Sequence, residues 1–159
     1  MKEKKPSKAE IKEIINYVTE RELYRDSIVK FAYSPRVTLE GIWKAYSDGL
    51  CGNLALLLKN CFPTLKMVYF YSEKNEYEAN HMLVEQDGAY FDIMGEWDEN
   101  EVKQRLTKHF REPREIAIRE VKDGEVVPGA NKEYWDKYTN EDCRLSIQRL
   151  KELRKEQAD

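Results

Sequence analysis

The sequence predicts an α+β fold for this chain, on the basis of three changes in residue pattern along its length. The first part carries apolar residues at helical intervals. From Leu65 the pattern changes to short runs rich in aromatic and β-branched residues, and Asp-Gly pairs between such runs are typical of hairpins. From about Asn131 the pattern is helical again. Helices followed by a meander of strands and then by further helices indicate the α+β class.

The first element is a helix preceded by a short tail. Ser7 and Glu10 have the spacing of a capping box, and the apolar stripe that follows predicts a helix over residues 8–24. Residues 1–7 are charged, and we expect them to form a flexible tail. The chain is expected to form a single domain over residues 1–159, because no linker long enough to divide it is present.

Two further helical stretches precede the central part of the chain. The amphipathic stretch SIVKFAY is expected to stop at Ser34, because a residue before proline is disfavoured in helical geometry. Thr38 is placed to cap a short helix over LEGIWKAY. The segment SDGLCG then breaks this helix.

A central helix follows, with a cysteine at its start. NLALLLKNCF is apolar around most of its circumference, so we expect it in the middle of the fold, packed on a small antiparallel sheet. Cys51 then lies at a helix N-terminus, where unpaired backbone N–H groups favour thiolate over thiol. The same groups are suited to receive negative charge on a substrate oxygen, and Gly49 and Gly52 leave room for a substrate. Cys51 is therefore the candidate nucleophile.

The strands ANHMLVE and AYFDIM are joined by Asp87-Gly88, which predicts a hairpin. A two-residue turn places His81 and Asp92 on the same face as diagonal neighbours, roughly 7–8 Å apart. A three-residue loop would send Asp92 to the other face, and Glu85 would then be the acid. His81 is the candidate base and Asp92 the candidate orienting group. The opposite face collects Met82, Val84, Phe91 and Ile93, which are all apolar.

The remaining elements complete the predicted order. Asp98 and Glu101 have capping spacing for a helix that runs to about Phe110. REIAIREVKDGEVV predicts a second hairpin, which turns at Asp123-Gly124.

The other cysteines and the second histidine are assigned no chemistry. Cys61 and Cys143 are expected to be buried free thiols, since three cysteines without paired spacing do not form a disulfide framework. His109 lies in a charged stretch at a predicted helix end, where a cation suits the helix dipole. No Cys-x-x-Cys or His-Glu-x-x-His spacing is present, so neither a metal nor another cofactor is predicted.

The composition of the chain indicates which kinds of partner and which compartment to expect. The net charge is −3, with Lys and Glu interleaved, so nucleic acid is not an expected partner. No apolar run approaches the roughly 20 residues of a membrane span, and the start lacks the apolar stretch of a secretion signal. A cytoplasmic protein without a membrane partner is the expectation, and the sequence leaves its oligomeric state open.

Three short stretches carry a resemblance to a known group: GLC at Gly49 to Cys51, HMLVE from His81, and YFD ending at Asp92. Together they resemble the core of transglutaminase-like proteins, within the wider papain-like group. The resemblance covers residues 49–95, and it implies a catalytic core over that range. It implies that Cys51 attacks an amide or ester carbonyl to form a thioester, with His81 as general base and Asp92 orienting the imidazole. The substrate would be a protein, a peptide or a small-molecule amide.

The sequence departs from that group at several positions. Leu83 stands where members often have tryptophan, and Ile93 where they often have proline. The segment before Cys51 lacks the glutamine that papain-like proteases use in the oxyanion hole. Trp43 and Tyr46 are the candidate replacements for this donor, and nothing in the sequence decides between them.

Two classes of function therefore remain open. One is a cysteine hydrolase or acyltransferase, and the other is a non-catalytic protein-binding module, such as an accessory or inhibitor protein of a phage or mobile element. An enzyme needs an accessible Cys51 with a lowered pKa, whereas a binding module would leave it buried with an ordinary thiol. A thiol redox role is disfavoured, because Cys61 lies about three helical turns from Cys51 on the same helix.

Overall fold

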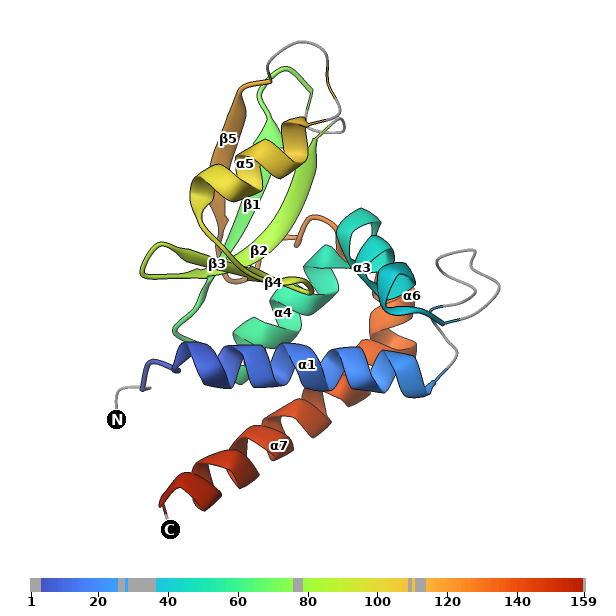
Figure 1. Ribbon diagram of the computed structural model, residues 1–159, viewed down its shortest axis with the longest axis vertical. Coiled ribbons are helices and arrows are strands. Elements are labelled where there is room, and N and C mark those ends of the chain that lie inside the picture. Colours follow the sequence, from blue (N-terminus) through green and yellow to red (C-terminus); the bar gives the residue numbers. More distant parts are fainter. Residues whose placement is uncertain are drawn as a thin grey trace.

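The computed structural model describes residues 4–25, 28, 37–75, 79–108, 110 and 114–158, and it confirms the α+β class (Figure 1). The helices are α1 (Lys8–Tyr24), α3 (Leu39–Asp48), α4 (Cys51–Cys61), α5 (Glu99–Thr107), α6 (Lys132–Tyr134), the π-helical turn η1 (Trp135–Thr139) and α7 (Asn140–Ala158). The strands are β1 (Lys66–Ser72), β2 (Asn80–Gln86), β3 (Ala89–Asp92), β4 (Gly95–Trp97) and β5 (Ile116–Val121). The helix predicted from SIVKFAY lies outside the described residues except for Ile28.

The predicted capping signals are present. The Ser7 side chain accepts from the backbone N–H of Glu10, and the Glu10 side chain accepts from the N–H of Ser7. The helix α1 begins at Lys8, directly after Ser7, as predicted. Thr38 caps α3 with a single bond, in which its side chain accepts from the N–H of Gly41.

The five strands form one antiparallel sheet in the order β4-β3-β2-β1-β5. The hairpin between β2 and β3 has the predicted two-residue turn, since Gln86 pairs with Ala89. Asp87 and Gly88 have φ angles of 51° and 82°, which place both in the left-handed region that this tight turn requires. The register therefore puts His81 and Asp92 on one face of the sheet.

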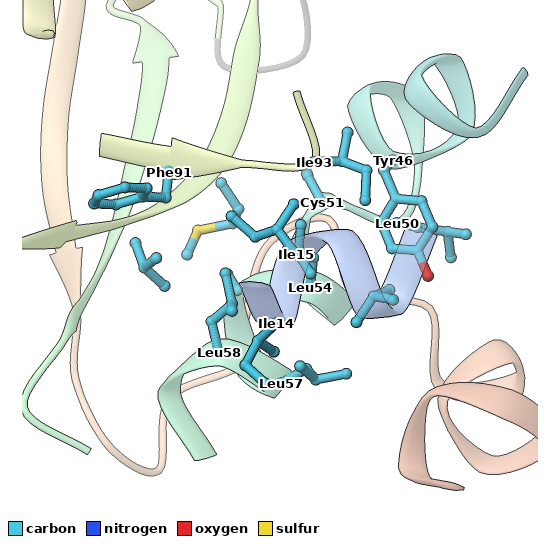
Figure 2. Close-up of a cluster of buried hydrophobic side chains, with 14 of the residues drawn as sticks. Ile14, Ile15, Tyr46, Leu50, Cys51, Leu54, Leu57, Leu58, Phe91 and Ile93 are labelled. Atoms are coloured by element: carbon cyan, nitrogen blue, oxygen red, sulfur yellow. The ribbon is translucent and has the colours of Figure 1, made fainter. Parts of the chain in front are cut away.

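Both faces of the sheet are covered. One face meets α4 and α1, where Figure 2 shows Ile14 and Ile15 packed near Leu54, Leu57 and Leu58. This face includes Met82, Val84, Phe91 and Ile93, as predicted. The other face, which carries Leu83 and Tyr90, packs against Val102 and Leu106 of α5. The face that holds His81 is consequently buried beneath α5.

The second predicted hairpin does not form. β5 pairs with β1, and no second strand follows it among residues 122–131. After a turn at Gly124, where φ is 87°, the chain crosses the start of α4. We call the crossing segment, residues 127–131, the strap. Pro128 has no N–H for a ladder and Gly129 has a φ of 71°, so this stretch cannot continue as a regular strand.

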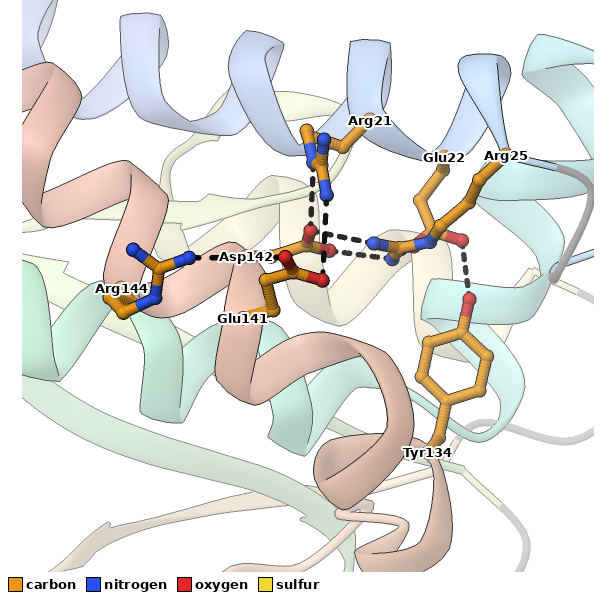
Figure 3. A network of polar contacts seen from close by, with 7 residues as sticks. All are labelled: Arg21, Glu22, Arg25, Tyr134, Glu141, Asp142 and Arg144. Atoms are coloured by element: carbon orange, nitrogen blue, oxygen red, sulfur yellow. Dashed lines mark hydrogen bonds and ion pairs between the residues drawn. The ribbon is translucent and has the colours of Figure 1, made fainter.

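A buried ionic network joins α1 to α7 (Figure 3). Asp142 is fully buried and binds the guanidinium groups of Arg21 at 3.1 Å and Arg25 at 2.6 Å. Arg25 also pairs with Glu22, which accepts from the hydroxyl of Tyr134. Burial raises the pKa of Glu22, although Arg25 and Tyr134 oppose that shift. The network fixes the helices that enclose α4.

Candidate functional site

Cys51 is the first residue of α4 and lies at one end of the sheet. Leu50 precedes it as N-cap and makes no side-chain hydrogen bond to the helix, so the first backbone N–H groups of α4 are not capped by a side chain. The sulfur of Cys51 contacts His81 and accepts from the backbone N–H of Met82. The start of α4 thus places the side chain of Cys51 against β2.

His81 and Asp92 meet across the hairpin. His81 is the second residue of β2, Asp92 is the last residue of β3, and His81 Nε2 lies 2.8 Å from Asp92 Oδ2. Because Nε2 faces the carboxylate, Nδ1 is the ring nitrogen left for Cys51. The three candidate residues named from the sequence therefore form one continuous line, Cys51 to His81 to Asp92.

The Asp92 carboxylate accepts from four donors. Oδ2 accepts from His81 and from Arg105 Nη1, each at 2.8 Å. Oδ1 accepts from the backbone N–H of Met94 and from Trp97 Nε1, each at 2.9 Å. This saturation keeps the carboxylate ionised and fixes the direction in which it holds the imidazole.

Cys51, His81 and Asp92 shift one another's pKa values in the direction that favours the charged form of each. Burial alone would raise the pKa of Asp92, but the bonds from His81 and Trp97 and the charge of Arg105 hold it at about 2. Burial would lower the pKa of His81, but Asp92 and Cys51 raise it to about 9. Burial would also raise the pKa of Cys51, yet the bond and charge of His81 outweigh it and lower the pKa. The arrangement favours a thiolate beside an imidazolium.

The whole line is buried. Cys51 is 6%, His81 4% and Asp92 3% exposed. The strap covers the cysteine, because a Cβ atom added at Gly129 would stand 2.4 Å from Cys51 Sγ. The backbone N–H of Gly52 also donates to the carbonyl of Gly129 at 2.9 Å. An N–H group expected to stabilise an oxyanion is thus occupied by the chain itself.

Asn53 of α4 holds the end of the strap. Its side-chain oxygen accepts from the backbone N–H of Asn131 at 2.7 Å, and its amide nitrogen donates to the carbonyl of the same residue at 3.2 Å. The amide nitrogen also donates to Thr139 Oγ1 at 3.1 Å. A fully buried amide with these partners fixes the strap against the first turn of α4.

Replacing Gly129 by alanine is expected to destabilise the protein by about 2 kcal/mol, because the new Cβ meets the sulfur of Cys51. Gly124→Ala is the matched control. Gly124 also has a positive φ, but its Cβ would meet nothing within 4 Å, so this variant reports the cost of the left-handed conformation alone. Urea unfolding of both variants measures the difference. Equal losses of stability would show that Gly129 does not contact Cys51.

The His81–Asp92 pair is expected to make stability depend on pH. The pKa of His81 is about 9 in the folded protein, against an ordinary value of 6.5, so the folded state binds this proton more tightly. The resulting stability is complete below about pH 6.5 and is lost as the pH rises through 9. In Cys51→Ser the contribution of Cys51 to this raised pKa is absent and that of Asp92 remains, so we expect Cys51→Ser to lose about 1 kcal/mol as the pH rises, relative to Cys51→Ser/His81→Gln.

The Cys51→Ser background is needed because the thiol contributes with the opposite sign: its pKa is lowered on folding, so it adds stability as the pH rises. Urea unfolding at several pH values measures the two variants. Parallel stability curves would contradict a raised pKa for His81.

A cavity of about 440 Å³ reaches His81 from the side of α5. Its wall includes Ser47 and Asp48 at the end of α3, together with Arg105 and Lys108. Arg105 also bonds Ser47 Oγ at 3.2 Å, so it links this wall to Asp92. Cys51 does not line the cavity, so a ligand there would meet the imidazole and not the sulfur.

Other sequence-based candidates are not part of this line. Glu85, the fallback acid, accepts from the N–H of Gly88 in the hairpin turn. Tyr46 is buried in the core near Leu50 (Figure 2), and its hydroxyl has no partner among the described residues. Trp43 packs against the same core. His109 lies outside the described residues. Within the described part of the chain, no three His, Cys, Asp or Glu side chains are arranged so that they could hold a metal ion together.

Arg105, Gly129 and Asn53 were not predicted from the sequence. Arg105 follows Asp92 by 13 positions on a different element. Gly129 lies 78 positions after Cys51, and nothing in the sequence indicates that its segment returns to α4. Asn53 is the one that a sequence signal could have indicated, as a polar residue within the apolar run of the central helix.

A family model described as "Phage YunG-like protein" matches residues 34–144, which is more than half of the chain and contains Cys51, His81 and Asp92. The chain belongs to the Phage YunG-like family. No curated protein and no solved structure gave a match. In the described residues of this Phage YunG-like protein, no helix is both long and apolar enough to cross a membrane.

The family match corrects the resemblance drawn from the sequence. The assignment to transglutaminase-like or papain-like proteins is wrong, because the family that matches is Phage YunG-like. The resemblance rested on three short stretches within residues 49–95, and it lacked the expected residues at Leu83 and Ile93. The family does not support the description "cysteine hydrolase" either, and it fits a phage-associated protein better.

Proposed function

We propose that this Phage YunG-like protein is a phage accessory protein that acts by binding another protein, and that Cys51, His81 and Asp92 form a buried polar anchor within it. The observation that supports this proposal is the strap. It covers the sulfur of Cys51 through Gly129 and occupies the N–H of Gly52. A carbonyl substrate would need both positions.

The polar line has a physical role in such a protein. His81 and Asp92 join the start of β2 to the end of β3, and Arg105 links this pair to α5. Cys51 joins the line to α4. Buried charged groups of this kind fix the relative positions of the elements that carry them, since a shift of one element would leave a charge unpaired.

Site-resolved alkylation tests the proposal. The folded protein is treated with iodoacetamide from pH 6 to 9, and the modified cysteines are mapped by mass spectrometry. We expect Cys51 to stay protected across the range in spite of its lowered pKa, because the strap excludes the reagent. Modification of the unfolded chain in urea provides the control. Rapid modification of Cys51 near pH 6 in the folded protein would overturn the proposal.

Partner capture gives a second test. The tagged protein is used to isolate partners from phage-infected cells, and Cys51→Ser and Asp92→Asn are compared with the unchanged chain. A binding function predicts that Cys51→Ser retains the same partners, because the thiol is not exposed. Loss of a partner in Cys51→Ser alone, with the fold intact, would argue for a covalent role of the thiol.

Thiol chemistry at Cys51 is the second candidate function, and the hydrogen-bonded line favours it. His81 lies between Cys51 and the fully hydrogen-bonded carboxylate of Asp92. This is the order that a nucleophile, its base and an orienting group require. In such a reaction Cys51 would attack an amide or ester carbonyl and His81 would protonate the leaving group.

The two candidates differ in what displacement of the strap should do. Only the second requires the strap to move before reaction, since the strap lies against Cys51 Sγ. Turnover of a p-nitrophenyl ester that appears when the strap is displaced, and disappears in Cys51→Ala, would favour the second candidate over the first.

A further inference from the structure

Cys61 and Cys143 lie together in the core, away from Cys51. Cys61 is the last residue of α4, and Cys143 lies in the first turn of α7, which packs against α4. They are separated by 82 positions in the sequence, yet their thiols are hydrogen-bonded to each other. Both side chains are buried, with exposed fractions of 7% and 6%. The fold thus creates a thiol pair that the spacing of the cysteines does not suggest.

The two thiols are not equivalent. Cys61 donates its proton toward Cys143, which raises the pKa of Cys61 well above the ordinary range. The bond from Cys61 lowers the pKa of Cys143, and a second bond from Asn60 acts in the same direction. Burial and the charge of the nearby Asp142 act to raise the pKa of Cys143. The carboxylate of Asp142 is itself paired with Arg21 and Arg25 (Figure 3). Cys143 is therefore the more acidic thiol of the pair.

A thiolate with a second thiol in contact is the arrangement that oxidation to a disulfide requires. We propose that Cys61 and Cys143 form a disulfide that links the end of α4 to the start of α7 when the protein meets a hydroperoxide. The proposal is independent of the binding function, because neither cysteine belongs to the line of Cys51, His81 and Asp92.

The reaction proceeds in two balanced steps. The Cys143 thiolate attacks one oxygen of hydrogen peroxide, the O–O bond breaks, and the products are a sulfenic acid and hydroxide. Cys61 loses its proton, its sulfur attacks the sulfenic sulfur, and the S–O bond breaks as water leaves. Overall two thiols are oxidised by two electrons, and one peroxide is reduced to two waters. Hydrogen peroxide is small enough for a site with little exposed surface.

The disulfide would tie together helices that enclose the polar line. α4 begins at Cys51, and α7 carries Asp142, which binds Arg21 of α1. A link between residues so far apart in the chain restricts the unfolded state strongly. Oxidation is therefore expected to stabilise the folded protein and to hold α4 against α7.

The experiment uses Cys51→Ser, which leaves Cys61 and Cys143 as its thiols. The folded variant is treated with a small excess of hydrogen peroxide, denatured, and analysed by thiol titration and peptide mapping without reductant. We expect loss of both thiols, a mass lower by two hydrogens, and a linked pair of peptides. The Tm is expected to rise by roughly 5 °C or more and to return after reduction with dithiothreitol.

Two outcomes would overturn the proposal: thiols that both stay free, or separate oxidation of each sulfur without a link between them. Cys143→Ser is the matched control, since it leaves Cys61 without its partner and should show neither the linked peptides nor the rise in Tm. Peptide mapping also identifies the linked cysteines in the unchanged chain, so the test does not depend on the folding of Cys51→Ser.

Discussion

Gly52→Ala is expected to destabilise the folded protein by about 3 kcal/mol. Helix propensity alone predicts the opposite sign, because alanine is favoured over glycine within a helix by about 1 kcal/mol. We expect a loss of stability instead, because the strap crosses α4 at Gly52. A Cβ atom at Gly52 would stand 2.4 Å from the carbonyl oxygen of Pro128, 2.5 Å from the nitrogen of Ala130 and 2.6 Å from the carbonyl carbon of Gly129.

These three atoms belong to the backbone, so no side chain can turn aside to relieve the contact. The strap must move away from α4, and the bond from the N–H of Gly52 to the carbonyl of Gly129 is then lost. Where the variant folds, Cys51 should become reactive toward iodoacetamide. Urea unfolding and the alkylation rate measure the two consequences separately.

Gly41→Ala is the matched control for Gly52→Ala. Gly41 is also helical, in α3, and its Cβ would meet a single atom, Thr38 Oγ1, at 3.1 Å. A hydroxyl can adjust by a few tenths of an ångström, so we expect a change within about 1 kcal/mol in either direction. If Gly52→Ala behaves like Gly41→Ala, and Cys51 stays protected in both, the strap does not lie on α4.

Asp92→Asn is expected to cost 3–5 kcal/mol, the range typical of a buried ion pair that loses one partner. The substitution nearly preserves the volume but removes the negative charge. His81 and Arg105 each lose a carboxylate acceptor at 2.8 Å. The pKa of His81 should fall from about 9, because burial then outweighs the remaining partners. NMR titration of the imidazole and urea unfolding measure both effects.

Glu96→Gln serves as the matched control for Asp92→Asn. Glu96 lies on β4, four positions after Asp92, and pairs with Lys8 and Lys12 at 2.7 and 3.0 Å. Its side chain is 28% exposed, so solvent screens these pairs and the expected loss is below about 1 kcal/mol. A loss for Asp92→Asn no larger than for Glu96→Gln, with an unchanged pKa of His81, would show that Asp92 is not the anchor of the line.

Local sequence signals predicted the elements that depend on neighbouring residues. The capping box of Ser7 and Glu10 predicted the start of α1, and Asp87-Gly88 predicted the turn that sets the register of His81 and Asp92. Such features involve residues within a few positions of each other, so their physics is readable from the chain. The shared face of His81 and Asp92 was predictable for the same reason, whereas the approach of Cys51, 30 positions before His81, was implied only by the resemblance to another group.

Features that depend on distant packing were not predictable. The second hairpin failed because the chain after Gly124 crosses α4, and the face carrying His81 is buried because α5 folds over it. The resemblance to transglutaminase-like proteins was wrong because it weighed three short stretches alone, whereas the Phage YunG-like family model matches the whole range of residues 34–144.

The sequence by itself determined the α+β class, most of the helix and strand positions, and the shared face of His81 and Asp92, because periodicity, caps and turns act over a few residues. Only the tertiary structure decided that the strap closes over Cys51 and that Cys61 meets Cys143. Both contacts join residues about 80 positions apart. The physical reason is that close packing of helices and loops, which has no local signature, brings such residues together.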